Sequence, residues 1–181
     1  MNAIGMIETN SIPAGIEAGD AMLKSANVEL VTAMAVCAGK YIVMVSGDVA
    51  AVKSAVADGK PVAGNFLVDD IVIANVDDQV ITAIAACSEV GDMAALGIVE
   101  TYSLASAVIC ADAAVKAADV ALIEIRLGRG LGGKAFFTMN GDVAAVKAAV
   151  EAASIEGEAH GMMANTVVIP SPHKDIYKAI Y

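Results

Sequence analysis

Short apolar runs alternate along this chain with segments of helical periodicity. In residues 1–90 the apolar runs are rich in β-branched residues, which is typical of strands. They predict four strands, at Ala3–Glu8, Leu30–Val36, Tyr41–Val45 and Leu67–Val76. The second and third strands flank Ala35–Lys40, a short segment with a glycine that we expect to form the tight loop of a hairpin.

The segments between these strands are predicted to be helices. Ser11 can cap the first helix, and Pro13 is tolerated in its first turn, where a missing N–H has little effect. Apolar residues at helical spacing predict one packed face on this helix, made of Ile12, Ile16, Gly19 and Leu23. A turn and a cap precede a second helix at Val49–Ala57, and a short helix is expected near Asp77–Ala86.

The second half of the chain repeats the first. Gly5–Thr9 returns as Gly97–Thr101, and Gly47–Lys53 returns letter for letter as Gly141–Lys147. The first pair is 92 residues apart and the second pair is 94, so the second copy has gained two residues. The additional residues fall in Gly128–Gly133, the counterpart of the hairpin loop in the first copy.

A repeat of about ninety residues is too long for a solenoid unit and has the size of a small domain. It predicts two tandem domains, at 1–90 and 95–181, joined by the short polar segment near Ser88–Ala94. Each domain is expected to be a mixed sheet flanked by helices, so the fold class is α/β or α+β. The second copy should contain strands at Ala135–Met139 and Met162–Ile169, helices at Val143–Ala152 and His173–Ile180, and a helix face of Leu104, Val108, Ala111 and Val115.

The composition favours large buried interfaces over a membrane span. The chain is 57% hydrophobic and 18% charged, and its mean hydropathy is +0.67. A membrane-spanning helix needs about 18 consecutive apolar residues. Charged residues interrupt the most apolar region at Glu29, Lys40, Asp48, Lys53 and Asp58. Interfaces between subunits therefore account better for the excess of small apolar residues.

The net charge and the cysteine content indicate which partners and which cellular compartment to expect. A net charge of −10 argues against nucleic acid as a partner, because nucleic-acid binding needs a basic face. The first ten residues contain no Lys or Arg, so we expect no signal peptide and a cytoplasmic protein. The three cysteines lack the spacing of a disulfide framework, and a reducing compartment keeps them as thiols or metal ligands.

Cys37 is the most conspicuous candidate for chemistry, because a thiol in a hairpin loop is more available than one in a core. Within one chain the next cysteine is fifty residues away, whereas an iron–sulfur cluster normally needs about four thiolates. Two interpretations stay open from the residues alone. Cys37 is either a small packed residue, as free cysteines commonly are, or a ligand to a metal shared between copies of the chain. Cys110 is expected in the core, and Cys87 is given no function.

Other candidate residues give weaker signals. Gly128–Lys134 matches no phosphate-binding loop pattern and leads into a predicted strand, so a flexible turn is preferred over a nucleotide site. Within it, Arg129 would place a positive charge in an opening. Glu8 and Glu100 end equivalent strands, and a repeated structural role explains them without catalysis.

The repeated motifs resemble the shell-protein domain of bacterial microcompartments. They are Gly-x-Ile/Val-Glu-Thr, Asp-Ala-x-x-Lys and Gly-Asp-Val-Ala-Ala-Val-Lys, with a closing Ile169-Pro170-Ser171-Pro172-His173. Two copies in one chain resemble the tandem-domain, trimer-forming type, and most closely its propanediol-utilisation, iron–sulfur subtype. In that subtype the hairpin loop reads Cys-Pro-Gly-Lys, whereas Ala38 stands in the place of the proline here. The family's closing motif has an arginine where this chain has Ser171, and Asn75 occupies the equivalent place in the first copy.

The resemblance implies a structural shell tile without enzyme activity, built as a homotrimer with a pseudo-six-fold ring. It implies one 4Fe–4S cluster per trimer, held by Cys37 at the three-fold pore, for electron transfer or cluster delivery across the shell. The alternative is a tile without a cluster whose pore conducts small metabolites. The implied partners are neighbouring shell proteins in a hexagonal lattice and encapsulated enzymes. The implied pore loops are Ala38, Gly39, Lys40, Gly128, Arg129, Gly130, Leu131, Gly132 and Gly133, and the implied lattice-edge residues are Lys24 and Lys116.

Overall fold

The chain forms two compact units. The computed structural model describes residues 3–86, 88, 94–128 and 130–180. The first unit contains the described residues up to Val76, together with Ser103–Ala105 and Gly128–Lys134. The second unit contains the other described residues from Asp77 onward. Segments of the second repeat therefore complete the first unit.

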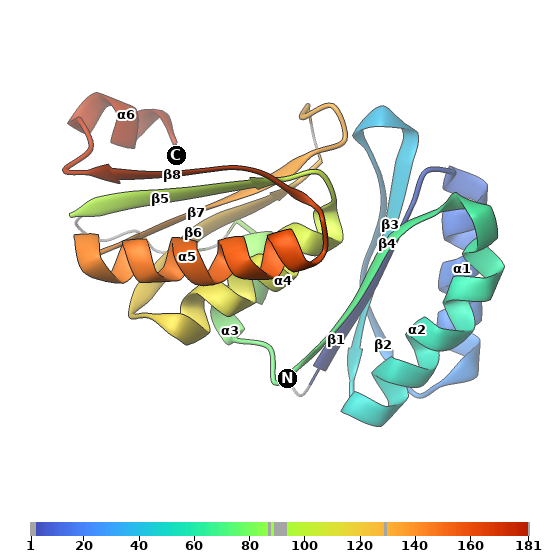
Figure 1. Cartoon of the computed structure of the whole chain (residues 1–181). Coiled ribbons are helices and arrows are strands. Elements are labelled where there is room, and N and C mark those ends of the chain that lie inside the picture. The colour runs from blue at the N-terminus through green and yellow to red at the C-terminus, as the bar shows by residue number, and fades with distance from the viewer. Residues whose placement is uncertain (1–2, 87, 89–93, 129, 181) are drawn as a thin grey trace. The chain divides into compact units, whose positions relative to one another are not determined.

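The first unit is one sheet with two helices on one of its faces (Figure 1). Its sheet is antiparallel, with the strand order β2-β3-β1-β4. The helices α1 and α2 pack against each other and on the sheet. The elements are β1 (Ala3–Thr9), α1 (Ile12–Ser25), β2 (Glu29–Val36), β3 (Lys40–Gly47), α2 (Val49–Ala63) and β4 (Leu67–Ala74).

The second unit has the same sheet topology, with the strand order β6-β7-β5-β8. The helix α5 packs on β5 and β8, and the short helix α3 packs against β6. The helix α4 begins at residues that belong to the first unit. The elements are α3 (Asp78–Ile84), β5 (Ala95–Thr101), α4 (Leu104–Ala117), β6 (Val120–Leu127), β7 (Ala135–Gly141), α5 (Val143–Ala159), β8 (Met163–Pro170) and α6 (Lys174–Ala179).

The predicted fold class is confirmed, but the expectation of a mixed sheet is wrong. Every strand pairing in the described residues is antiparallel. The physical reason is the connectivity: α1 and α2 join strands that are not neighbours in the sheet, so no helix-linked pair forms a parallel ladder. The predicted strands are all present, and their ends differ from the prediction by at most two residues.

The structure reproduces the sequence repeat down to its irregularities. The pairing of β1 with β4 shifts between Glu8 and Thr9, and that of β5 with β8 shifts between Glu100 and Thr101. The short helix α3 belongs to the second unit although it follows β4 in the chain. The domain limits at 1–90 and 95–181 remain a prediction, and residues 89–93 of the expected connector lie outside the described residues.

The expected packed face of α1 is wrong for three of its four residues, and only Gly19 is buried as predicted. Ile12, Ile16 and Leu23 are 40%, 54% and 39% exposed. The buried face consists of small residues and one methionine: Ala14, Gly15, Ala18, Gly19 and Met22. A methyl group added at Gly15 would lie 2.7 Å from Tyr41 Cβ, so this face brings α1 too close to the sheet for large side chains. In α4 the expectation holds for Leu104, Val108 and Ala111, which are fully buried, whereas Val115 is half-buried.

Both long helices extend further than predicted. α2 ends at Ala63 instead of Ala57, and α5 ends at Ala159 instead of Ala152. In α2 the buried positions continue at helical spacing through Gly59 and Ala63, so tertiary packing outweighs the local effect of Pro61. A proline in the last turn removes one backbone hydrogen bond without preventing the packing.

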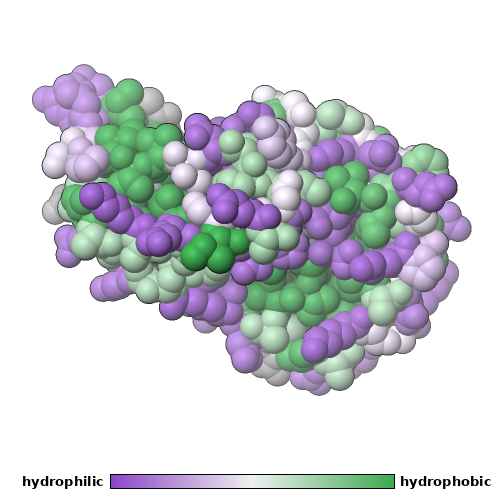
Figure 2. Space-filling view, viewed as in Figure 1, coloured by the Kyte–Doolittle hydropathy of each residue, from purple (hydrophilic) through white to green (hydrophobic). Residues whose placement is uncertain are grey.

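Hydrophobic side chains also reach the surface of each unit (Figure 2). The most exposed large ones include Ile155, Ile16, Ile176 and Leu30. Exposed apolar surface of this kind is typical of interfaces between subunits. None of the described helices is long and apolar enough to cross a membrane.

The close packing of α1 gives a first testable prediction. Gly15→Val places a branched side chain within 2.6 Å of Thr9 Oγ1 and 2.7 Å of Tyr41 Cβ. We expect the free energy of unfolding to fall by about 2 kcal/mol, because overpacking forces the helix away from the sheet. Chemical denaturation measures this free energy. The matched control is Ile16→Val on the exposed face, which should change stability by less than about 0.5 kcal/mol. Equal effects of the two variants would contradict the packing described here.

Candidate functional site

Cys37 lies in a single 3-10 turn, Cys37–Gly39, between β2 and β3, as the hairpin prediction requires. Its backbone N–H donates to the carbonyl oxygen of Gly128 at 2.8 Å. Its Sγ accepts a hydrogen bond from the N–H of Gly130, also at 2.8 Å. The thiol is therefore half-buried and held on two sides by the Gly128–Lys134 segment, which belongs to the same unit.

Left-handed backbone explains the glycine content of this segment. Gly128, Gly130, Gly132 and Gly133 have φ values of 70°, 75°, 61° and 88°. Residues with a Cβ are disfavoured in this left-handed region of backbone conformation, whereas glycine is not. The segment leads into the strand β7, so it offers no helix N-terminus to a phosphate group. Leu131 is half-buried and Gly132 is exposed, and Arg129 lies outside the described residues.

Lys40, expected in a pore loop, forms a buried ion pair with Glu8. Its Nζ lies 2.7 Å from Glu8 Oε1 and donates another hydrogen bond to the carbonyl oxygen of Gly133 at 2.7 Å. The Lys40 side chain is 14% exposed, and the Glu8 side chain is fully buried. The ion pair therefore ties the base of the cysteine turn to β1 and to the inserted segment.

The second carboxylate oxygen of Glu8 caps the start of α4. It accepts hydrogen bonds from the backbone N–H groups of Leu104 at 2.7 Å and Ala105 at 3.2 Å. An anion is stabilised there, because the first N–H groups of a helix have no partner in the helix and carry partial positive charge. The sequence analysis assigned Glu8 only an unspecified structural role, since nothing in the sequence places it beside a helix 96 residues away.

Burial raises the pKa of the Glu8 carboxyl above its ordinary value of 4.5. The charge of Lys40 and the two backbone donors oppose this rise, but they do not cancel the desolvation. A raised pKa means that the folded state resists ionisation of Glu8. This contribution to stability is complete below pH 4.5 and is lost as the pH rises through the folded-state pKa.

The two predicted lattice-edge lysines have different surroundings. Lys24 pairs with Asp20 one helical turn away at 2.5 Å, and its side chain is 74% exposed. Lys116 pairs with Asp112 at 2.5 Å, but Asp112 is nearly buried and also accepts a hydrogen bond from Asp77 N–H. Lys24 is the freer of the two to change partners, because an exposed ion pair is weak.

The remaining cysteines do not join Cys37. Cys110 is fully buried in α4, as expected for a core residue. Cys87 lies outside the described residues. Within the described part of the chain there is no group of three or more His, Cys, Asp or Glu side chains that would hold a metal ion. One chain therefore contributes a single thiol at this turn.

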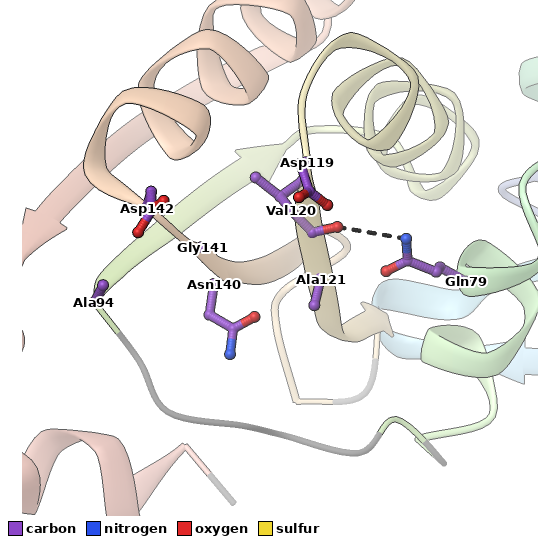
Figure 3. Close-up of a pocket in the computed structure, with 8 residues that line it drawn as sticks. All are labelled: Gln79, Ala94, Asp119, Val120, Ala121, Asn140, Gly141 and Asp142. Atoms are coloured by element: carbon purple, nitrogen blue, oxygen red, sulfur yellow. Dashed lines mark hydrogen bonds between the residues drawn. The ribbon is translucent and has the colours of Figure 1, made fainter.

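The second unit contains an open pocket of about 530 Å³ beside β6 and β7 (Figure 3). Gln79 of α3 lines it and binds the edge of β6 with both ends of its amide. Nε2 donates to the carbonyl oxygen of Val120 at 3.4 Å, and Oε1 accepts from Leu122 N–H at 3.0 Å. Asp119, Asn140 and Asp142 also line the pocket, which contains no thiol or imidazole. The sequence analysis did not find it, because Gln79 is distant from β6 in sequence.

Comparisons with known proteins agree on one family. The BMC domain model matches residues 3–76 and 95–172. The bacterial microcompartment shell protein PduT of Citrobacter freundii is 44% identical over 176 residues, which cover 97% of this chain and 96% of that protein. The crystal structure of a microcompartment protein from Desulfitobacterium hafniense is similar with a TM-score of 0.87 and 50% identity, over 98% of this chain and 99% of that chain.

A more distant relative comes from another type of compartment. The carboxysome assembly protein CcmO of Synechocystis is 30% identical over 190 aligned residues, covering 97% of this chain and 63% of that protein. The chain belongs to the BMC domain family and is a tandem-domain shell protein of bacterial microcompartments. Among its relatives it is similar to PduT over nearly its whole length.

The Glu8–Lys40 pair gives a second prediction. Lys40→Met leaves a buried carboxylate without its counter-charge, so we expect the free energy of unfolding to fall by about 3 kcal/mol at neutral pH. The pKa of Glu8 rises further in this variant. The deficit relative to the wild type should therefore grow as the pH rises above 4.5 and shrink below it.

The matched control is the double variant Glu8→Gln with Lys40→Met, analysed as a double-mutant cycle by chemical denaturation at several pH values. Its loss of stability should be well below the sum of the two single losses. Losses that simply add at every pH would show that the two side chains do not interact.

The cysteine turn gives a third prediction. Ala38 has a φ of 61°, a region that disfavours a residue with a Cβ by roughly 1–2 kcal/mol. Ala38→Gly should therefore raise the melting temperature, whereas Ala35→Gly in the neighbouring strand should lower it. Ala38→Pro should lower it most, because proline is confined to a φ near −65°. A stabilising Ala38→Pro would contradict the turn conformation.

Proposed function

We propose that this shell protein forms a homotrimer in which three Cys37 side chains meet on the three-fold axis and hold one 4Fe–4S cluster. The cluster would transfer electrons across the shell or be delivered to enzymes inside it. The observation that carries the proposal is the position of Cys37. Its thiol lies at the tip of a hairpin, half-buried and hydrogen-bonded, and among the described residues it belongs to no group of three or more metal-binding side chains.

The chemistry of the turn fits one third of a cluster site. Thiolates are the usual ligands of iron–sulfur clusters, and hydrogen bonds to the sulfur atoms are among the factors that set the potential. Gly130 N–H already donates to Cys37 Sγ at 2.8 Å. Cys37 comes from the first repeat and Gly130 from the second, so each chain has one such turn. A trimer would therefore present three identical turns.

The repeat also supports three ligands instead of six. The counterpart of the cysteine turn in the second copy is Gly128–Gly133, which has no cysteine and contains the two additional residues. A ring of three chains would therefore alternate thiol-bearing and glycine-rich loops around its pore. Closed rings of identical interfaces are the usual form of such assemblies.

The fourth prediction concerns the cluster. After anaerobic reconstitution with iron and sulfide, we expect one 4Fe–4S cluster per three chains, measured by iron and sulfide analysis and by EPR after reduction. Cys37→Ser should abolish the signal. The matched control is Cys110→Ser, which removes a buried thiol and should leave the signal intact if the protein folds. A wild-type protein that forms trimers without binding a cluster, or a signal that survives Cys37→Ser, would contradict the proposal.

A pore for small metabolites is the second candidate. A Cβ added at Gly39, Gly130 or Gly132 would meet nothing within 4 Å, so these backbone segments face open space where a polar solute has room. Lys40 contributes little to such a pore, because its ammonium group is committed to Glu8 and Gly133. The same reconstitution separates the two candidates, since a conducting pore requires no bound iron.

The lattice role is also part of the proposal. Neighbouring shell proteins would meet this tile at its outer edge, where Lys24 offers an exposed ammonium group whose ion pair with Asp20 is easily exchanged. Encapsulated enzymes are further proposed partners. The arginine of the family's closing motif is replaced by Ser171, so edge contacts would depend more on the lysine.

A further inference from the structure

The open pocket beside β6 and β7 contains a buried amide that the surrounding protein leaves without a hydrogen bond. Asn140 of β7 is 5% exposed and lines the pocket, and Figure 3 shows its amide directed away from the strand into this space. Ala121 on β6 and Leu96 on β5 stand opposite it in the sheet, and neither side chain can form a hydrogen bond. Within the described part of the chain the amide has no partner. A buried polar group in this state indicates a ligand, because leaving it unpaired is unfavourable.

Asp119 and Asp142 bring two negative charges to the same pocket. The ladder between β6 and β7 ends at the pair Val120–Gly141, and the two aspartates are the next residues outward on the neighbouring segments. A Cβ placed at Gly141 would lie 3.2 Å from the carbonyl oxygen of Asp119, so the two segments are in close contact. Both aspartates are exposed, and like charges at neighbouring positions repel each other.

Neither carboxylate is committed to another group in the described part of the chain. Asp142 is the N-cap residue of α5, but its side chain makes no capping hydrogen bond to the helix. Its charge offsets the partial positive charge of the helix N-terminus. The carboxylate oxygens of Asp119 and Asp142 therefore remain available to a ligand.

The oxygen-rich lining favours a hard cation. None of the described residues that line the pocket carries a positive charge, so two carboxylates exclude an anionic ligand. Gln79 has both ends of its amide bound to β6, which leaves the amide oxygen of Asn140 as the neutral donor. Carboxylate oxygens, amide oxygens and water are the ligands that Ca²⁺ and Mg²⁺ prefer. An open volume of about 530 Å³ also has room for the water molecules that such an ion retains.

We propose that this pocket binds one hard divalent cation, Ca²⁺ or Mg²⁺, through Asp119, Asp142 and the amide oxygen of Asn140, with water completing the coordination. The ion relieves the repulsion between the two carboxylates and links the segment before β6 to the start of α5. Ca²⁺ should bind more tightly than Mg²⁺, because Ca²⁺ accepts irregular geometry. The site uses no thiol and no second chain, so it is independent of the proposed cluster and trimer.

The internal repeat supplies a comparison within the same chain. Asn27, Ser46 and Asp48 are the counterparts of Asp119, Asn140 and Asp142. The backbone geometry is similar, since a Cβ placed at Gly47 would lie 3.4 Å from the carbonyl oxygen of Asn27. The first copy has one carboxylate where the second has two. We therefore expect one cation site per chain, in the second unit.

The fifth prediction tests the site by isothermal titration calorimetry. The full chain is treated with a chelator, dialysed, and titrated separately with CaCl₂ and MgCl₂ at low ionic strength. We expect one Ca²⁺ per chain with a dissociation constant of roughly 0.1–1 mM, the range of weak calcium sites. The melting temperature should rise with the Ca²⁺ concentration, because the ion binds the folded state.

Three variants and one control identify the ligands. Asp119→Asn and Asp142→Asn should each weaken Ca²⁺ binding at least about tenfold, because each removes one charged ligand, and asparagine keeps the N-cap preference. Asn140→Asp adds a third carboxylate and should strengthen binding about tenfold, a gain that unfolding cannot produce. The matched control is Asp48→Asn, which removes the same charge at the equivalent helix start and should change the affinity by less than about twofold.

Two results would overturn the inference. The first is a wild type that binds neither cation at 10 mM, a concentration at least about ten times the expected dissociation constant. The second is binding that the Asp119, Asp142 and Asn140 variants leave unchanged, which would place the ion elsewhere on the acidic surface. Neither result bears on the cluster, since Ca²⁺ and Mg²⁺ do not compete for thiolates.

Discussion

The buried carboxylate of Glu8 is the interaction on which the first unit depends. One of its oxygens faces the ammonium group of Lys40, and the other caps the first turn of α4. Removing such a charge from water is unfavourable unless each of its oxygens has a partner, and here both do. The same lysine binds Gly133, so one carboxylate links β1, the cysteine turn, the inserted segment and the start of a helix from the second repeat. The network binds the segment whose Gly128 and Gly130 form hydrogen bonds with Cys37.

Duplication gives the chain two copies of one sheet, and a few sequence differences give the two copies different surfaces. The cysteine turn and its glycine-rich counterpart occupy equivalent hairpins, but only the first offers a thiol. The β6 edge is covered by α3, whereas the equivalent β2 edge is exposed. In the proposed trimer, further copies of the same chain would provide the additional thiolates.

Much of the fold could be predicted from the sequence because its signals are local. Strand periodicity and the Ser11 cap act over a few residues, and the repeat carries the same local signals into the second half of the chain; the structure confirms them. The face of α1 could not be predicted, since hydrophobicity favoured Ile12 and Ile16 while close packing selected Gly15 and Ala18. The partners of Glu8 and Gln79 also escaped prediction, because they lie far away in sequence. Cys37 was identified by its turn, whereas the N–H donor at Gly130 required the structure.

The central claim is that three Cys37 side chains, one from each chain of a trimer, hold one 4Fe–4S cluster. Native mass spectrometry of the anaerobically reconstituted protein tests trimer and cluster in one measurement. The account predicts a dominant species with the mass of three chains and one 4Fe–4S cluster, which loses the cluster in Cys37→Ser. A trimer that carries no iron and sulfide, or a cluster bound to a single chain, would contradict it.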